Sequence, residues 1–209
     1  MLASTLVTMA AVCALLVFEW RGSRIGIWIA KPIAALGFVA TALLAGALDT
    51  RYGSLVLVGL VFSFFGDVFL IPRGKATFAA GLVAFLLGHV AYTIAFLGRS
   101  PRLAVVAGAA ALLVVPVVIV LRWLGPHVGE GLRTPVKLYV AVISAMLACA
   151  AGATAATGNR LILAGAFAFF VSDLAVARGQ FVEKSFSNKA WGLPLYFGGQ
   201  LLLAWSIVG

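Results

Sequence analysis

Long apolar stretches make up most of this chain, and short polar connections separate them. Eight such stretches cover about residues 2–18, 25–48, 53–72, 76–98, 103–121, 134–157, 161–177 and 191–208. Each has about the length of a bilayer-spanning helix, and none alternates with the period of two that is typical of barrel strands. The pattern predicts an all-α polytopic membrane protein with about eight transmembrane helices, forming one domain over residues 1–209.

Composition points the same way. Hydrophobic residues make up 64% of the chain and charged residues 10%, whereas a soluble domain is nearer half apolar and a quarter charged. A chain of 209 residues cannot bury so much apolar surface in one core, so we expect lipid to cover the remainder.

Charge gives a predicted orientation and excludes one class of partner. The net charge is +9, but the basic residues are scattered singly between apolar stretches, so we expect no nucleic-acid partner. The connections after the odd-numbered stretches carry nine Lys or Arg residues, and those after the even-numbered stretches carry four. The basic side faces the cytoplasm in membrane proteins. The count therefore predicts a multi-pass protein of the inner (plasma) membrane with both termini outside.

The two halves of the chain share a spacing. Lys31 precedes Asp67 by 36 positions, and Lys137 precedes Asp173 by the same number, while an FxFF motif lies before each aspartate. Four spans restore the starting orientation, so these matches suggest a parallel 4+4 internal repeat with halves 1–100 and 101–209.

Ionisable residues within the apolar stretches are the candidates for chemistry. They are Lys31, Asp67, His89, Lys137 and Asp173. Charge is costly in a membrane and usually faces a bundle interior or a watery cavity. Counting the helical rise places the two lysines and two aspartates in one layer, roughly 5–10 Å below the cytoplasmic interface. We therefore expect Asp67 and Asp173 to converge in a site toward the cytoplasmic side.

Two carboxylates in one semi-buried layer favour acid–base chemistry, because one member of a close pair keeps its proton at neutral pH. Further polar residues on the same helices are candidates for binding or support: Tyr92, Tyr139, Tyr196, Gln200 and Arg73. The two histidines have no carboxylate at ligand spacing, and we expect no metal and no cofactor. There is no GxSxG motif, and Cys13 and Cys149 lie in separate apolar stretches, which disfavours serine or cysteine nucleophiles.

At these residues the chain resembles the YhhN-like family, which includes the lysoplasmalogenases. The resemblance runs from about residue 25 to the end and is strongest between Gly66 and Tyr92. It rests on the following elements in order: Lys31-Pro32, Gly66-Asp67-Val68-Phe69-Leu70, Phe78, Gly81, Phe85, His89, Tyr92, Pro135, Tyr139, Met146, Gly165-Ala166-Phe167, Ser172-Asp173, Tyr196 and Gln200.

The resemblance implies a membrane hydrolase that cleaves the vinyl ether bond of lysoplasmalogen to a fatty aldehyde and glycerophospho-ethanolamine or -choline. The family's proposed catalytic aspartates correspond to Asp67 and Asp173. The implied partners are a lysophospholipid substrate in the bilayer and membrane lipids, with the phosphate held by Lys31, Lys137 or Arg73 and the chain among Phe62, Phe65 and Phe169.

Two other interpretations stay open at this point, and so does the oligomeric state. A small-solute or lipid transporter can use a parallel repeat with buried ionisable residues. A structural protein can use Lys–Asp pairs only to hold its helices together.

Overall fold

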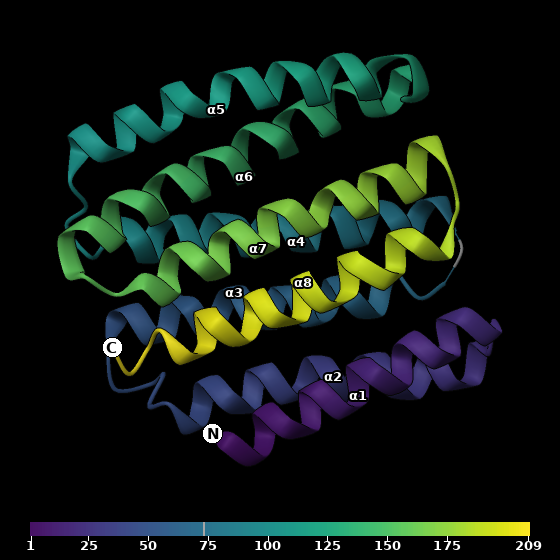
Figure 1. Cartoon of the computed structure of the whole chain (residues 1–209), viewed down its shortest axis with the longest axis horizontal. Coiled ribbons are helices and arrows are strands. Elements are labelled where there is room, and N and C mark those ends of the chain that lie inside the picture. Colours follow the sequence, from purple (N-terminus) through teal and green to yellow (C-terminus); the bar gives the residue numbers. More distant parts are fainter. Residues whose placement is uncertain (73) are drawn as a thin grey trace.

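The computed structural model describes residues 1–72 and 74–209, and within them the chain folds into a bundle of eight long helices with no strand (Figure 1). This confirms the predicted all-α class. The helices are α1 (Leu2–Arg21), α2 (Arg24–Leu44), α3 (Arg51–Phe69), α4 (Lys75–Leu97), α5 (Leu103–Leu124), α6 (Glu130–Thr157), α7 (Arg160–Ala177) and α8 (Phe186–Trp205).

Seven of these helices, α1 to α7, are long and apolar enough to cross a membrane. The eighth, α8, has 20 residues, but Asn188, Lys189 and Gln200 lower its hydropathy. It nevertheless runs alongside the other helices through the bundle (Figure 1). The protein is therefore a multi-pass membrane protein.

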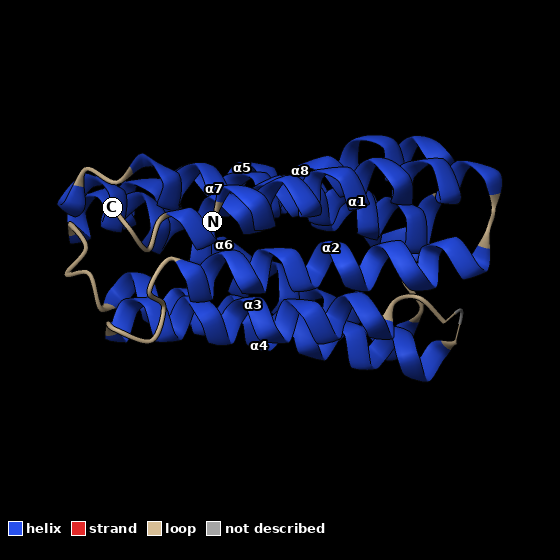
Figure 2. Ribbon diagram, turned by 90° about the horizontal axis from the view of Figure 1, so that it is seen from below, coloured by secondary structure: helices blue, strands red, loops and turns tan. Residues whose placement is uncertain are grey.

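Short connections make successive helices antiparallel, so both termini lie at the same end of the bundle (Figure 1). Seen from the side, α3 and α4 form one layer, and α1, α7 and α8 lie in another (Figure 2). Helices distant in sequence also pack together, since α8 contacts α1 and α2, and α4 contacts α6. Together with the contacts between neighbouring helices, these contacts bring residues of α2, α3, α4, α6, α7 and α8 into one region.

The two connections that the sequence pattern predicts to be longest, 122–133 and 178–190, are largely helical. After α5, a 3₁₀ turn covers Gly125–His127, and α6 begins at Glu130. After α7, a π-helical turn covers Arg178–Val182, and α8 begins at Phe186 after the Ser185 cap. The first turns of α6 and α8 contain polar residues. A hydropathy pattern therefore leaves them out of the predicted helices, although the backbone is helical there.

Small residues allow α7 and α8 to pack closely together. A Cβ atom on Gly165 of α7 would lie 2.9 Å from the Gly199 carbonyl oxygen of α8, and one on Gly199 would lie 2.9 Å from the Gly165 carbonyl oxygen. Lipid gives membrane helices no hydrophobic driving force for association, so they associate through close van der Waals packing, and glycine allows their backbones to approach. This crossing fixes α8, and the residues it carries, against α7.

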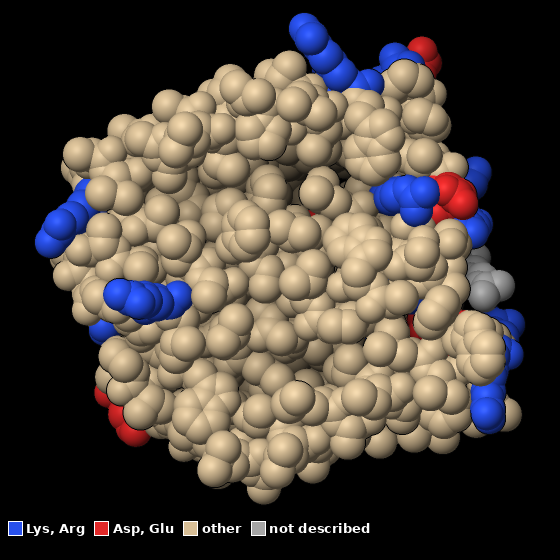
Figure 3. Space-filling view, in the orientation of Figure 1, with Lys and Arg blue, Asp and Glu red and all other residues tan. Residues whose placement is uncertain are grey.

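On the face that Figure 3 shows, Lys and Arg side chains gather toward the two ends of the molecule, and the surface between them is almost free of charge. Helix α5 lies at the edge of the bundle (Figure 1), with Leu124 as its one buried residue. The uncharged belt is the surface expected of a protein surrounded by lipid.

Equivalent helix pairs of the two halves pack together: α1 with α2 and α5 with α6, and α3 with α4 and α7 with α8. Antiparallel neighbours pack in this way with or without duplication, so the internal repeat stays a prediction.

Candidate functional site

Asp67 lies near the end of α3 that faces away from the termini, and its carboxylate is held from two other helices. Lys31 Nζ of α2 lies 3.1 Å from Asp67 Oδ1, and Tyr196 of α8 donates a 2.7 Å hydrogen bond to Asp67 Oδ2. The Lys31 and Asp67 side chains are 8% and 3% exposed. Burial of both charges makes this a fully desolvated ion pair, which is costly unless its geometry is well satisfied.

Lys31 is satisfied further by a 3.2 Å hydrogen bond to the backbone carbonyl of Asp67. That carbonyl is available because α3 ends two residues later, at Phe69. The last four carbonyl groups of a helix have no partner within the helix. The end of α3 therefore supplies both the carboxylate and the backbone acceptor for one ammonium group.

Asp173 of α7 has a different set of partners. Tyr139 of α6 donates a 2.6 Å hydrogen bond to Asp173 Oδ2, and His89 Nε2 of α4 lies 3.7 Å from the same oxygen. No Lys or Arg pairs with Asp173 in the described part of the chain. One aspartate therefore faces an ammonium group, and the other faces a phenol and an imidazole.

One aromatic ring contacts both sets of partners. Phe169 is fully buried, and its ring centroid lies 4.4 Å from that of His89 and 5.3 Å from that of Tyr196. The Phe85 ring packs edge-on against Phe169 and Tyr196 at 6.1 and 5.7 Å. The two carboxylates therefore lie in neighbouring polar clusters with an apolar wall of aromatic rings beside them.

Deeper in the bundle, Tyr92 of α4 donates a 2.6 Å hydrogen bond to Gln200 Oε1 of α8. Both residues are fully buried. A Cβ atom on Gly59 would collide with the Tyr92 ring, so this glycine makes room for the ring against α3. Within the described residues, Gln200 Nε2 and both ring nitrogens of His89 have no hydrogen-bond partner. Such atoms are rare in protein interiors and often belong to functional sites.

One of the predicted residues, Lys137, does not join these clusters. Lys137 is exposed on α6 and forms no ion pair with Asp173 among the described residues. It lies two positions from Tyr139, or roughly 200° around the helix, so only one of the two can face Asp173. The matched Lys–Asp spacing therefore does not produce matched ion pairs. Arg73 lies outside the described residues.

The two aspartates differ in their access to the surface. The Asp173 side chain is 15% exposed, compared with 3% for Asp67. The space-filling view shows a hollow in the uncharged face, with an acidic side chain visible inside it (Figure 3). Asp173 is therefore the carboxyl group that a molecule in the surrounding phase reaches more readily.

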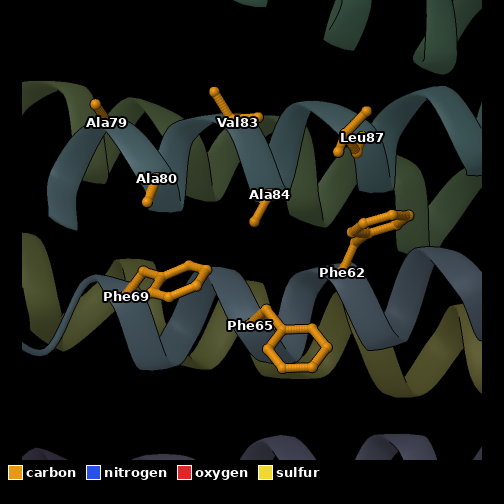
Figure 4. A pocket seen from close by; sticks show the side chains of 8 residues that line it. All are labelled: Phe62, Phe65, Phe69, Ala79, Ala80, Val83, Ala84 and Leu87. Atoms are coloured by element: carbon orange, nitrogen blue, oxygen red, sulfur yellow. The ribbon is translucent and has the colours of Figure 1, made fainter. Parts of the chain in front are cut away.

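A separate apolar groove of about 540 Å³ runs between α3 and α4. Phe62, Phe65 and Phe69 line it from α3, opposite a row of alanine, valine and leucine side chains of α4 (Figure 4). Asp67 is two residues from Phe65, roughly 200° around the helix, and its partners lie on α2 and α8. The groove and the carboxylate thus occupy different faces of α3, and Phe169 lies apart from both Phe62 and Phe65.

The sequence pattern missed one polar contact beside the Asp67 cluster. Lys189 Nζ of α8 lies 3.6 Å from Glu19 Oε1 of α1. Because Glu19 lies at the end of an apolar stretch and Lys189 in a predicted connection, neither stood out as intramembrane. Glu19 lies in the last turn of α1 and Lys189 near the start of α8, and each is at the helix end whose dipole disfavours its charge. This unfavourable placement is the feature of the sequence that could have indicated the contact.

The arrangement can perform acid–base chemistry in a water-poor setting. It offers one carboxylate neutralised by an ammonium group and one carboxyl group bound to weaker partners, with tyrosine hydroxyl groups beside both. The described residues contain no group of three His, Cys, Asp or Glu side chains placed to hold a metal ion.

Comparison with known proteins matches the pattern of the YhhN family to residues 26–207. The chain is 32% identical to lysoplasmalogenase TMEM86A of Bos taurus over 73% of this chain and 65% of the bovine protein. It is 33% identical to the human protein of the same name over 87% of this chain and 73% of the relative.

A protein named lysoplasmalogenase from Mycobacterium tuberculosis is 33% identical over 66% of this chain and 53% of the relative. The chain thus spans between about half and three quarters of the length of these relatives. No solved structure matches it. On the match to residues 26–207, the chain belongs to the YhhN family.

Proposed function

We propose that this protein is a membrane lysoplasmalogenase, which hydrolyses the vinyl ether bond of a lysoplasmalogen to a fatty aldehyde and a glycerophospho-ethanolamine or -choline. The observation that carries the proposal is the pair of differently partnered, buried carboxyl groups, Asp67 and Asp173, in a chain whose relatives are named for this activity. No observation favours transport, because the buried charges lie toward one end of the bundle.

The reaction needs an acid first and a water molecule second. A proton adds to the β-carbon of the vinyl ether, and the resulting oxocarbenium-like cation is stabilised by a nearby anion. Water then adds to the α-carbon and releases a proton, and the hemiacetal collapses to the aldehyde and the glycerol hydroxyl group. One water molecule is consumed and the catalytic proton is returned, as in glycoside hydrolysis by two carboxyl groups.

The partners of the two aspartates suggest how these tasks divide. The Lys31 ammonium group, at 3.1 Å, favours the anionic form of Asp67, which suits Asp67 to stabilise the cation and activate water. Asp173 has no ammonium or guanidinium partner in the described residues and is the more exposed, which suits it to carry the proton to the substrate. Tyr139 and Tyr196 hold the two carboxyl groups in position, and His89 lies beside Asp173.

The test is aldehyde release by purified protein from lysoplasmenylethanolamine, followed with a coupled alcohol dehydrogenase. In D₂O the trapped alcohol should carry one deuterium at the carbon next to the former carbonyl, because the β-carbon receives the catalytic proton. The corresponding saturated alkyl ether lipid should not be cleaved, since it has no double bond to protonate.

A matched control separates catalysis from the general effect of removing a carboxylate. Asp173→Asn should abolish turnover, whereas Asp49→Asn, at an exposed position in the connection between α2 and α3, should leave it unchanged. Aldehyde release without deuterium at that carbon would exclude the proposed protonation, and an active Asp173→Asn protein would exclude Asp173 as the acid.

A further inference from the structure

At the end of the bundle away from the termini, a second ion pair lies beside the Lys31–Asp67 pair. It joins Glu19 of α1 to Lys189 of α8 at 3.6 Å. The Lys189 side chain is 48% exposed and that of Glu19 is 18% exposed. Lys189 also lies within Coulombic range of Lys31 and Asp67. Two ammonium groups, Lys31 and Lys189, and two carboxylates, Asp67 and Glu19, are therefore grouped at this end of the bundle.

Helix stability does not explain these two rim charges. Glu19 lies in the last turn of α1, where the helix dipole disfavours an anion, and Lys189 lies at the start of α8, where it disfavours a cation. The ion pair that joins them is long and partly exposed, and such pairs contribute little to stability. A role in recognition accounts for their placement better than a role in folding.

The start of α8 is held in place, so the position of Lys189 is defined. Asn188 accepts a 2.6 Å hydrogen bond from Arg178 and donates a 2.7 Å bond to the Glu183 carbonyl oxygen. Lys189 and Tyr196 are seven residues apart and share one face of α8, which separates them by roughly 10 Å along the axis. Tyr196 in turn donates to Asp67. A glycerophosphoethanolamine unit is long enough to reach from the rim to the Asp67 cluster.

We propose that Lys189 and Glu19 bind the zwitterionic headgroup of a lysophospholipid, with the Lys189 ammonium on the phosphate and the Glu19 carboxylate on the amine. This inference rests on the proposed function and adds headgroup selectivity to it. The phosphate finds the exposed Lys189 ammonium group, and the amine finds the partly exposed Glu19 carboxylate beside it. Because the Glu19–Lys189 pair is weak, it opens readily to accept two opposite charges.

The test compares substrates that differ only in the headgroup. Alkenyl lysophosphatidylethanolamine carries phosphate and amine, and alkenyl lysophosphatidic acid carries phosphate alone. Lys189→Gln should raise KM about tenfold for both. Glu19→Gln should raise KM about tenfold for the ethanolamine lipid and leave it unchanged or lower it for the phosphatidic acid, because a repulsive carboxylate is removed.

A matched control lies at the same end of the bundle. Glu130 is exposed at the start of α6 and forms no ion pair in the described part of the chain, and Glu130→Gln removes the same charge without touching the proposed headgroup site. It should change neither KM. Equal effects of Glu19→Gln on the two lipids, or an effect of Glu130→Gln as large as that of Glu19→Gln, would overturn the proposal.

Binding can be measured without turnover, which separates this proposal from the proposed function. Uncleavable alkyl ether lysolipids with the same two headgroups should raise the thermal stability of the wild-type protein. Glu19→Gln should remove the advantage of the ethanolamine lipid. If this binding pattern appears without any vinyl ether hydrolysis, the headgroup site stands and the enzymatic proposal fails. Stabilisation by inorganic phosphate equal to that by the lipids would assign the site to free anions and overturn a headgroup site.

Discussion

Replacing either aspartate by asparagine should stop the reaction, but the two variants should differ widely in stability. Asp67→Asn leaves the Lys31 ammonium buried at 8% side-chain exposure without its counter-ion. Removing one partner of a buried ion pair costs about 3–5 kcal/mol. Asp173→Asn leaves no ammonium group unpaired, and the amide oxygen still accepts the hydrogen bond from Tyr139. Its expected cost is at most about 1 kcal/mol.

The difference of about 2–5 kcal/mol should be visible in thermal unfolding of the purified proteins in one detergent. At about 2–4 °C per kcal/mol for chains of this length, Asp67→Asn should unfold on the order of 10 °C below Asp173→Asn. Lys31→Met should be destabilised like Asp67→Asn, because it leaves the carboxylate unpaired. The double variant Lys31→Met/Asp67→Asn should recover most of the loss, since neither charge remains.

Equal unfolding temperatures for Asp67→Asn and Asp173→Asn would refute this reasoning. So would a double variant whose loss is the sum of the two single losses, because independent residues give additive changes and coupled residues do not. Aldehyde release measured on the same samples would show whether an inactive protein is still folded.

Three further predictions test other parts of the structure. Tyr139→Phe removes the 2.6 Å hydrogen bond to Asp173; it should cost about 1 kcal/mol in stability and lower kcat more than it raises KM. Gly165→Leu should destabilise the protein by roughly 1–3 kcal/mol, because its side chain enters the contact with Gly199 and Leu203, whereas Gly108→Leu, with open space around it, should be neutral in the same unfolding assay. With the native Cys13 and Cys149 replaced by alanine, a cysteine at Gly209 should react with an impermeant maleimide added outside intact cells, and one at Lys75 should be protected; the reverse result would show a cytoplasmic C-terminus.

The helices could be predicted from sequence because a lipid-exposed segment must be long, apolar and internally hydrogen-bonded. Their ends could not, because helix starts at Glu130 and Phe186 include polar residues that a hydropathy window excludes. The polar start of α8 is also what carries Lys189 into contact with Glu19.

The depth of a residue in the bundle can be predicted from its position along a helix, and this predicted one layer that holds Lys31, Asp67, Lys137 and Asp173. Rotation about the helix axis and the packing of distant helices do not follow from depth. Lys137 shares the depth of Asp173 but points outward, while Tyr139 takes its place. Likewise, the contact between Tyr196 and Asp67 depends on α8 packing near α3, which no local pattern in the sequence indicates.

The buried Lys31–Asp67 pair also constrains how the protein can be made. A lysine or aspartate at the centre of an isolated helix costs about 2.5–3.5 kcal/mol on insertion, and Lys31 of α2 and Asp67 of α3, which lie nearer to a helix end, carry a smaller cost of the same kind. If α2 and α3 enter the membrane together as a hairpin, Lys31 and Asp67 can pair and neutralise each other's charge before either helix is surrounded by lipid. The second partner of Asp67, Tyr196, arrives only with α8, which is synthesised well after α2 and α3. Folding of the Asp67 cluster is therefore completed only when α8 joins the bundle, and a nascent protein that stalls before α8 would present an incomplete polar core to the membrane quality-control machinery.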